Sequence, residues 1–190
     1  MTDTETDKYR PLKDAFGRFA TGIAIASCWS PSTGHPSASN KENAGKDGRK
    51  PIAITINSFT SVSLEPPLVL WCLEKRASTY DDFMGADHYG ISILDGDQED
   101  LSNRFASFNP KPLSLKEMGL TEKSSLSGAP LLTDCLASLD CVIEKRIDAG
   151  DHIIMLGRVE NYKSVQGKPL IYFASQYMVG PHSDKNTPQG

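Results

Sequence analysis

Short apolar stretches alternate with polar turns along this chain, and most of the stretches have the length of a β-strand. They predict seven strands, at residues 22–29, 51–63, 67–73, 89–94, 130–147, 152–165 and 168–179. The second of these starts as a strand and ends in a hydroxyl-rich turn. PLVLWCL, residues 67–73, is apolar at nearly every position, which predicts a central strand covered on both faces.

Helical periodicity is confined to short segments near the strands. Leu12, Phe16 and Phe19 recur at i, i+4 and i+7, which predicts an amphipathic helix that ends near Gly22. Residues 97–108 predict a second helix, with acidic residues in its first turn.

A further short helix is expected to open at Ser78, with Asp81 at the spacing of a capping box. The predicted strands mostly follow one another through turns, without intervening helices. This order favours a mainly β, antiparallel barrel with short peripheral helices over a doubly wound sheet.

The 190 residues are enough for one ordinary domain. Residues 1–7 and 181–190 are polar and are predicted to be disordered tails, which leaves a single domain over 8–180. Residues 30–50 contain no large apolar side chain. Since loops of this length are uncommon inside compact domains, this segment is expected to be a disordered or mobile insertion.

Charge and hydropathy argue against a nucleic-acid-binding protein and against a membrane protein. The 20 basic residues are outnumbered by 24 acidic ones, so nothing suggests a surface that follows a nucleic-acid backbone. The N-terminal segment MTDTETDKYR has no apolar core of a signal peptide, and the longest apolar runs are too short to cross a bilayer. We therefore expect a soluble cytoplasmic protein with neither a nucleic acid nor a membrane as partner.

Metal and nucleophile motifs are missing. The cysteines form no C-x-x-C pair and lie in apolar segments, which predicts buried free thiols at Cys28, Cys72, Cys135 and Cys141. The histidines are scattered, at His35, His88, His152 and His182, so no metal site is expected. The chain has no G-x-G-x-x-G, P-loop or G-x-S-x-G motif, so an enzyme of this sequence would rely on a bound organic cofactor.

The segment TINSFTSVSLEPP, residues 55–67, is the most informative part of the chain. Five hydroxyl side chains and Asn57 crowd into nine positions where one strand ends and the next begins. Such a turn can direct neutral hydrogen-bond donors at a ligand with many acceptors, and a flavin is such a ligand. The alternative is a turn whose hydroxyls only bond their own backbone. Composition alone leaves both interpretations open.

Four blocks of sequence resemble the flavin reductase-like family. The stretch NSFTSVSLEPPLVLWCL, residues 57–73, is similar to the family's signature. In the same order as in the family come FGRFATGIAI (16–25), DLSNRFASF (100–108) and DAGDHIIMLGRVE (148–160). The resemblance covers roughly residues 9–178. It implies an antiparallel split β-barrel of Greek-key type, the FMN-binding split barrel.

The resemblance also implies a set of flavin contacts. The end of a strand, at Thr55, Ile56, Asn57 and Ser58, would lie against the ring and contact it largely through backbone groups. The turn that follows, at Ser61, Val62 and Ser63, would continue around the ring and the ribityl tail, and Cys72 would lie near the ring. The phosphate end would meet Lys75, Ser78 and Thr79, and Phe105 would lie near the flavin or a dimer seam.

Physical alternatives accompany several of these assignments. Ser78 and Thr79 open a predicted helix, and a helix N-terminus is a ready anion site, but Ser78 also suits an ordinary N-cap. Lys75 is equally suited to be a solvated surface lysine, and Phe105 a core residue. Ile54 and Ile56 replace smaller residues common in the family, which matters only if side chains make the contacts.

His152 is the candidate catalytic residue. It ends the Gly-Asp-His pattern, which in the family implies a contact to the nicotinamide, and Asp151 before it could orient the turn. A lone histidine at such a junction is otherwise structural or exposed. Tyr177 could close the site from the last strand or belong to the core.

The function implied is that of an NAD(P)H:flavin oxidoreductase. It would transfer hydride from NADH or NADPH to FMN or FAD, as a C2 homodimer, and supply reduced flavin to a partner monooxygenase. The alternatives are a ferric reductase or another flavoenzyme of the same fold, a non-catalytic FMN-binding protein, or a barrel without a ligand.

Overall fold

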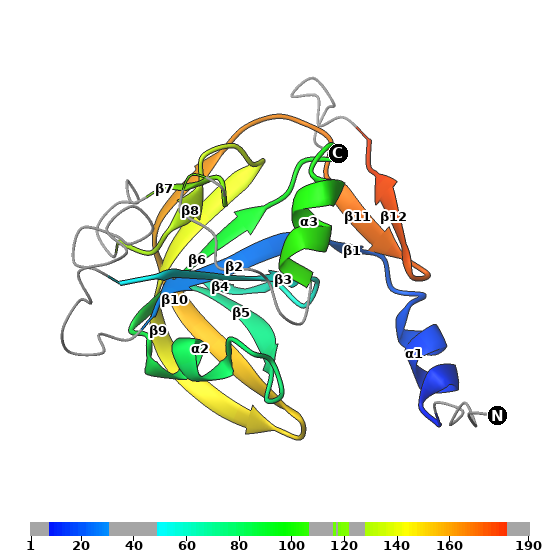
Figure 1. Cartoon of the computed structure of the whole chain (residues 1–190), viewed down its shortest axis with the longest axis horizontal. Helices are drawn as coiled ribbons and strands as arrows, with labels where there is room; N and C mark the ends of the chain where they lie inside the picture. Colours follow the sequence, from blue (N-terminus) through cyan, green and yellow to red (C-terminus); the bar gives the residue numbers. More distant parts are fainter. Residues whose placement is uncertain (1–7, 31–48, 107–115, 117, 122–127, 182–190) are drawn as a thin grey trace.

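The computed structural model describes residues 8–30, 49–106, 116, 118–121 and 128–181. Its main sheet has seven strands in the order β3 (Pro51–Ile56), β2 (Ala24–Trp29), β6 (His88–Ile93), β9 (Ala137–Ala149), β10 (His152–Ser164), β5 (Pro67–Glu74) and β4 (Thr60–Leu64). Every pair of neighbouring strands in it is antiparallel. Figure 1 shows this sheet curving through the centre of the molecule.

Smaller elements flank the main sheet (Figure 1). A three-stranded sheet has the strand order β1 (Thr21–Gly22), β11 (Leu170–Phe173), β12 (Gln176–Val179). A two-stranded sheet is formed by β7 (Leu120–Thr121) and β8 (Leu131–Leu132). The helices are α1 (Arg10–Phe16), α2 (Tyr80–Gly85) and α3 (Glu99–Ala106). The mainly β, antiparallel barrel with short peripheral helices is therefore confirmed.

A short connection forces the main sheet to curve. β3 and β4 form its two edges, yet only residues 57–59 join them. In a flat sheet these edges would lie about 29 Å apart. The connecting backbone can span at most about 14 Å. The sheet therefore closes on itself, but β3 and β4 are not hydrogen-bonded neighbours, so the barrel stays split beside this turn.

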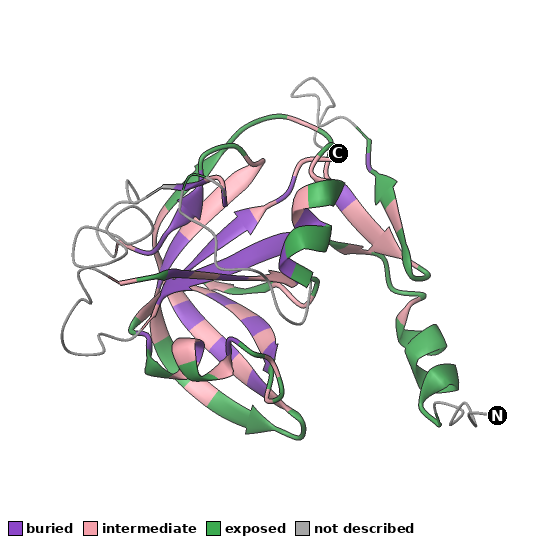
Figure 2. Cartoon of the chain, viewed as in Figure 1, coloured by how far each residue is buried: buried purple, intermediate pink, exposed green. Residues whose placement is uncertain are grey.

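The buried apolar residues form two cores. Figure 2 shows that buried residues are concentrated on the central strands. In the main core Trp71 is fully buried and packs edge-on against Phe83, at 4.9 Å between ring centroids, and against Tyr89, at 5.8 Å. Burial raises the pKa of the Cys141 thiol to about 12. The four cysteines are free thiols as predicted, two of them buried and two partly buried.

Several local features differ from the sequence-based expectation. The segments 130–147 and 168–179, each predicted as one strand, form β8 with β9 and β11 with β12. The hydroxyl-rich turn becomes strand β4, whose side chains are mostly exposed and so gave no apolar alternation. Helix α1 ends at Phe16, with Gly17 as its C-cap, and it buries no residue. Helix α2 begins at Tyr80 with Thr79 as N-cap and no side-chain capping bond, so Ser78 does not open it.

Strand β5 is covered on only one face. Val69, Trp71 and Leu73 are buried, whereas the alternating residues Leu68 and Leu70 are partly exposed. The predicted strand covered on both faces is therefore wrong for the single chain. The tails predicted at 1–7 and 182–190, and residues 31–48 of the polar insertion, lie outside the described residues.

Gly157 gives a test of the packing in the main core. A Cβ added there would meet the Tyr89 hydroxyl and lie 2.6 Å from its Cζ atom. We predict that Gly157→Ala lowers the free energy of unfolding by about 1–3 kcal/mol, because Tyr89 is fully enclosed and cannot yield. Urea unfolding measures the change. Gly22→Ala is the control, since an added Cβ there meets nothing within 4 Å, and equal stability of both variants would contradict the packing described.

Candidate functional site

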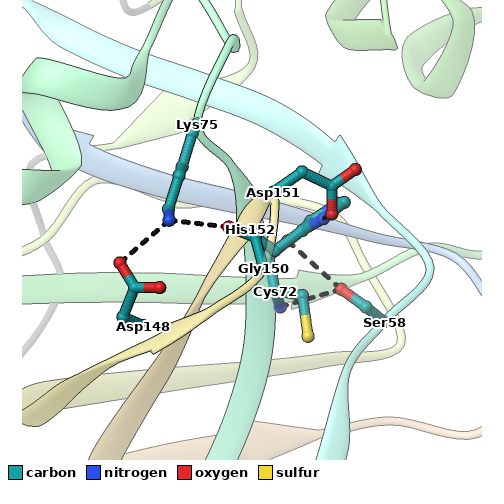
Figure 3. A network of polar contacts seen from close by, with 7 residues as sticks. All are labelled: Ser58, Cys72, Lys75, Asp148, Gly150, Asp151 and His152. Carbon is teal, nitrogen blue, oxygen red and sulfur yellow. Dashed lines mark hydrogen bonds and ion pairs between the residues drawn. The ribbon is translucent and has the colours of Figure 1, made fainter.

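The turn between β3 and β4 is fastened to strand β5 by Ser58. Its hydroxyl accepts a hydrogen bond from the Cys72 N–H at 3.0 Å and donates to the Cys72 carbonyl at 3.5 Å (Figure 3). The pairing of β4 with β5 extends no further than Thr60 opposite Leu70. Ser58 therefore continues the contact to β5 by one side chain beyond the end of the β-ladder.

Most other hydroxyls of this segment also bond backbone groups. Thr55 donates to the Ser102 carbonyl of α3 at 2.6 Å, Ser63 accepts from the Glu65 N–H at 3.2 Å, and Thr60 donates to the Ser61 carbonyl at 3.4 Å. For these side chains the alternative interpretation holds, in which the hydroxyls bond backbone groups of the protein itself. What the turn can still offer a ligand is the exposed Asn57 and Ser61 and nearby backbone groups.

A β-bulge places Val62 at the surface. The register between β4 and β5 shifts between Ser61 and Ser63, and Val62 is 49% exposed. Ile56, in contrast, is buried in the main core, so only its backbone can face a ligand. Bulky side chains at Ile54 and Ile56 therefore leave the exposed turn unobstructed, because both pack toward that core.

The outer face of β5 and β10 is apolar and partly exposed. Cys72 pairs with Ile154 and Leu70 with Leu156 across the two strands, and all four side chains are partly buried. Burial raises the pKa of the Cys72 thiol. A hydrogen bond between the Ser58 hydroxyl and the thiol side chain opposes that rise. A partly exposed apolar surface thus lies beside a turn with exposed polar groups, which suits a ligand with an apolar ring face and polar edges.

His152 lies on this same outer face. It opens β10 opposite Glu74, and in a β-strand side chains two residues apart point the same way, so His152, Ile154 and Cys72 share one face. The preceding loop is the two-residue turn Gly150-Asp151, and Gly150 has φ +68°, which suits the first position of a type II′ hairpin.

Asp151 orients the imidazole. Its carboxylate lies 2.8 Å from Nδ1 of His152 (Figure 3). The hydrogen bond to His152, followed by the charge of that ring, lowers the pKa of the Asp151 carboxyl. A carboxylate on Nδ1 favours a proton at that nitrogen and leaves Nε2 for an external partner.

Lys75 contacts the same hairpin. Its ammonium donates to the Asp148 carboxylate at 2.8 Å and to the Gly150 carbonyl at 2.7 Å (Figure 3). Its backbone N–H donates to the Asp151 carbonyl at 2.9 Å. The resemblance put Lys75 at the phosphate end of a flavin. In this structure two of its three ammonium protons are already directed at the hairpin.

The segment before α2 has one unpaired hydroxyl. Ser78 is exposed, whereas Thr79 is 9% exposed and its hydroxyl has no hydrogen-bond partner among the described residues. The other end of α2 is held by Arg146, which donates to the Phe83 carbonyl at 3.2 Å and to that of Ala86.

Phe105 lies in the second core, away from the β5 and β10 face. It is 3% exposed among Ile25, Leu94 and other core side chains. Tyr177 lies next to α3, where its hydroxyl is 2.8 Å from that of Ser102. The structure thus gathers Ser58, Cys72, Lys75 and His152 in one network, and leaves Thr55, Phe105 and Tyr177 beside α3.

Two residues of the network were not predicted from the sequence. Asp148 and Gly150 are the acceptors for Lys75, and no spacing rule joins position 75 to position 148. The DAGD turn itself could be predicted, because Gly next to Asp between two apolar stretches indicates a hairpin.

The described residues hold no group of three or more His, Cys, Asp or Glu side chains that could bind a metal ion. None of the described helices has the length and apolar character needed to span a bilayer.

Known proteins are similar to this chain in sequence and in fold. The chain is 36% identical over 155 residues to a probable flavin reductase of Rhizobium meliloti, and 36% identical over 171 residues to the reductase component of the flavin-dependent trigonelline monooxygenase of Acinetobacter baylyi. These alignments cover 82% and 90% of the chain, but only 43% and 49% of those relatives. The chain thus spans about half the length of either protein. An NADH-dependent flavin reductase of Rhodococcus is 34% identical, with 87% of this chain and 83% of that protein covered.

Solved structures agree with these relatives. The flavin reductase component BorF of a bacterial two-component tryptophan halogenase has a TM-score of 0.75 and 29% identity, over 92% of this chain and 99% of that one. The NADH:FAD oxidoreductase SgcE6 of Streptomyces globisporus, solved with NAD and FAD fragments, has a TM-score of 0.73 and 25% identity, over 100% and 99%.

The family match covers most of the described barrel. Residues 16–181, from the end of α1 to just past β12, match the family described as "Flavin reductase like domain". The split barrel, the NSFTSVS turn and the Gly-Asp-His hairpin are thus found together in one domain. The chain belongs to the flavin reductase-like family.

Proposed function

We propose that this protein is an NAD(P)H:flavin oxidoreductase that binds FMN or FAD against the outer face of β5 and β10. The observation that carries the proposal is that Cys72 and His152 share this face, on neighbouring strands, beside the turn that Ser58 holds in place. The names of relatives support the choice of substrates, since two of them are an NADH-dependent flavin reductase and an FMN reductase (NADH).

The residues present fit a flavin. The ring would lie on Cys72 and Ile154, with its polar edge toward the backbone of residues 57–63 and the hydroxyl of Ser61. These donors are neutral, so they satisfy ring acceptors without adding a fixed charge beside a ring that must accept hydride. A bound flavin supplies the hydride-accepting atom, N5. Thr79, with its unpaired hydroxyl, and Ser78 would meet the phosphate end.

The protein's own contribution would be alignment. Holding donor and acceptor stacked at near-attack distance can supply several of the roughly 7–11 kcal/mol available from proximity and orientation. His152 would hold the carboxamide of the nicotinamide through Nε2, while Asp151 keeps the imidazole in place from Nδ1. The hydride step itself needs no acid or base, so the Asp151–His152 pair would serve to bind and orient the nicotinamide.

Reduced flavin would pass to a partner monooxygenase in the cytoplasm. The support is that relatives such as the Acinetobacter protein are reductase components of flavin-dependent monooxygenases. An exchangeable flavin requires moderate affinity, and a micromolar Kd corresponds to about −8 kcal/mol.

The protein would act as a C2 homodimer. Helix α1 buries no residue, and Leu12, Phe16 and Phe19 are 49%, 69% and 78% exposed. A seven-residue helix is not stable in water by itself, so its apolar side needs a surface to pack on. A second copy would provide that surface, in keeping with the dimer that the family resemblance implies.

The His152 assignment predicts a kinetic effect. His152→Ala should lower kcat/KM for NADH about tenfold, the loss of about one good hydrogen bond, with the Kd of FMN unchanged. Anaerobic bleaching of the flavin by NADH and by NADPH measures it, with His88→Ala as control. Wild-type protein that leaves NAD(P)H oxidation at background with both FMN and FAD would contradict the proposed function.

The position of the flavin predicts protection of Cys72. Saturating FMN should slow alkylation of Cys72 by iodoacetamide and leave the half-buried Cys135 unaffected, as resolved by peptide mass spectrometry. Ser58→Ala removes the hydrogen bond that lowers the pKa of Cys72, so the pH profile of alkylation should move to higher pH. Unchanged alkylation of Cys72 with flavin bound would exclude this face as the binding site.

The dimer proposal predicts a mass. Wild-type protein should sediment at twice 20.7 kDa, and Phe16→Asp should shift it toward the monomer because a charge would be buried. Asp14→Asn on the opposite side of α1 also changes the charge by one unit and should leave the mass unchanged. A monomeric wild-type protein would refute the proposal.

A further inference from the structure

The end of strand β5 contacts the His152 hairpin at three points. Lys75, the first residue after the strand, reaches the Asp148 carboxylate and the Gly150 carbonyl with its ammonium, and the Asp151 carbonyl with its backbone N–H. The three acceptors belong to the last four residues before His152. We refer to these contacts as the Lys75 clamp.

The hairpin needs such a restraint. Asp148, Ala149, Gly150 and Asp151 are exposed, and the β-ladder between β5 and β10 begins only at His152 opposite Glu74. Without the clamp, these four residues would be held only by the pairing of β9 with β10, on the side away from β5.

The clamp also connects the two halves of the candidate site. Cys72, which Ser58 ties to the β3–β4 turn, and Lys75 are three residues apart on β5 and its immediate extension. A short, β-paired stretch therefore sets the separation between the proposed ring contact and the hairpin that carries His152 (Figure 3). A shift of the hairpin would move the imidazole relative to the ring.

We propose that Lys75 is a positioning residue for nicotinamide binding, which acts by holding the His152 hairpin through Asp148 and Gly150. This inference rests on the proposed function, and it replaces the phosphate contact that the family resemblance suggested for Lys75. The Lys75 side chain is 33% exposed and that of Asp148 75%, so the ion pair is partly screened by solvent and its effect is moderate.

The test uses Lys75→Met, Asp148→Asn and the double variant in the full chain, with Lys163→Met at the far end of β10 as control. Each single variant should lower kcat/KM for NADH about two- to fivefold. The double variant should lose no more than the worse single variant, because both remove the same contact. The ratio of Kd values for FMN and riboflavin should stay as in wild type, since the phosphate is the only difference between them.

Two results would overturn the proposal. If Lys75→Met weakens FMN but not riboflavin, while Asp148→Asn does not, the lysine is a phosphate ligand. If all variants match wild type in kcat/KM for NADH, the clamp has no positioning role. Because Asp148 is largely exposed, Asp148→Asn is expected to fold and decides the matter should Lys75→Met not fold.

Hydrogen exchange separates failure of this inference from failure of the proposed function. In flavin-free protein, Lys75→Met and Asp148→Asn should speed amide exchange in the segment 148–156, and Lys163→Met should not. Faster exchange together with a wild-type protein that never oxidises NADH would overturn the proposed function and with it the role in nicotinamide binding. Unchanged exchange in an active enzyme would overturn the clamp alone.

Discussion

The arrangement of this molecule depends on the connection at residues 57–59. It joins the two edge strands of a seven-stranded sheet, and its length forces those edges together without pairing them. The split in the barrel therefore lies where the backbone of Asn57 and its neighbours is exposed. Ser58 bonds the backbone of Cys72 and so holds the turn against β5. The polar residues that follow form β4, the edge strand of the sheet.

From this constraint follows the kind of recognition the protein can offer. The hydroxyls of Thr55, Ser58 and Ser63 are occupied by backbone groups, so they shape the turn. Backbone groups and the apolar outer face of β5 and β10 remain for a ligand. Recognition by neutral groups and an apolar surface suits a flavin that binds, is reduced and leaves.

The sequence predicted the barrel well because strand signals are local. β2, β5, β6 and β10 bury alternating or continuous apolar residues and are bounded by turn residues, so their existence could be read directly. β4 was missed, because four of its five side chains are exposed and only pairing with β5 makes it a strand. Likewise, the helical periodicity correctly predicted an amphipathic α1. It could not predict that the apolar side of this helix is left uncovered within one chain.

The site could be predicted only in part for a related reason. Ser58, Cys72 and His152 stood in motifs. The fold places Cys72 and His152 on one face and Ser58 at the edge of β5 beside them. The partners of Lys75 depend on which strand pairs with β10, and that pairing is nonlocal, between residues more than seventy positions apart. Phe105 matched a motif too, yet its place in the second core follows from α3 packing on β3, which the motif does not encode.

A crystal structure of the protein with FMN bound would test the central claim most directly. The account predicts the isoalloxazine ring on the outer face of β5 and β10, in contact with Cys72 and the backbone of residues 57–63. His152 Nε2 should face the open side of the ring. A flavin bound beside α3, near Phe105 and Tyr177, with the β5 and β10 face empty or covered by protein, would contradict it.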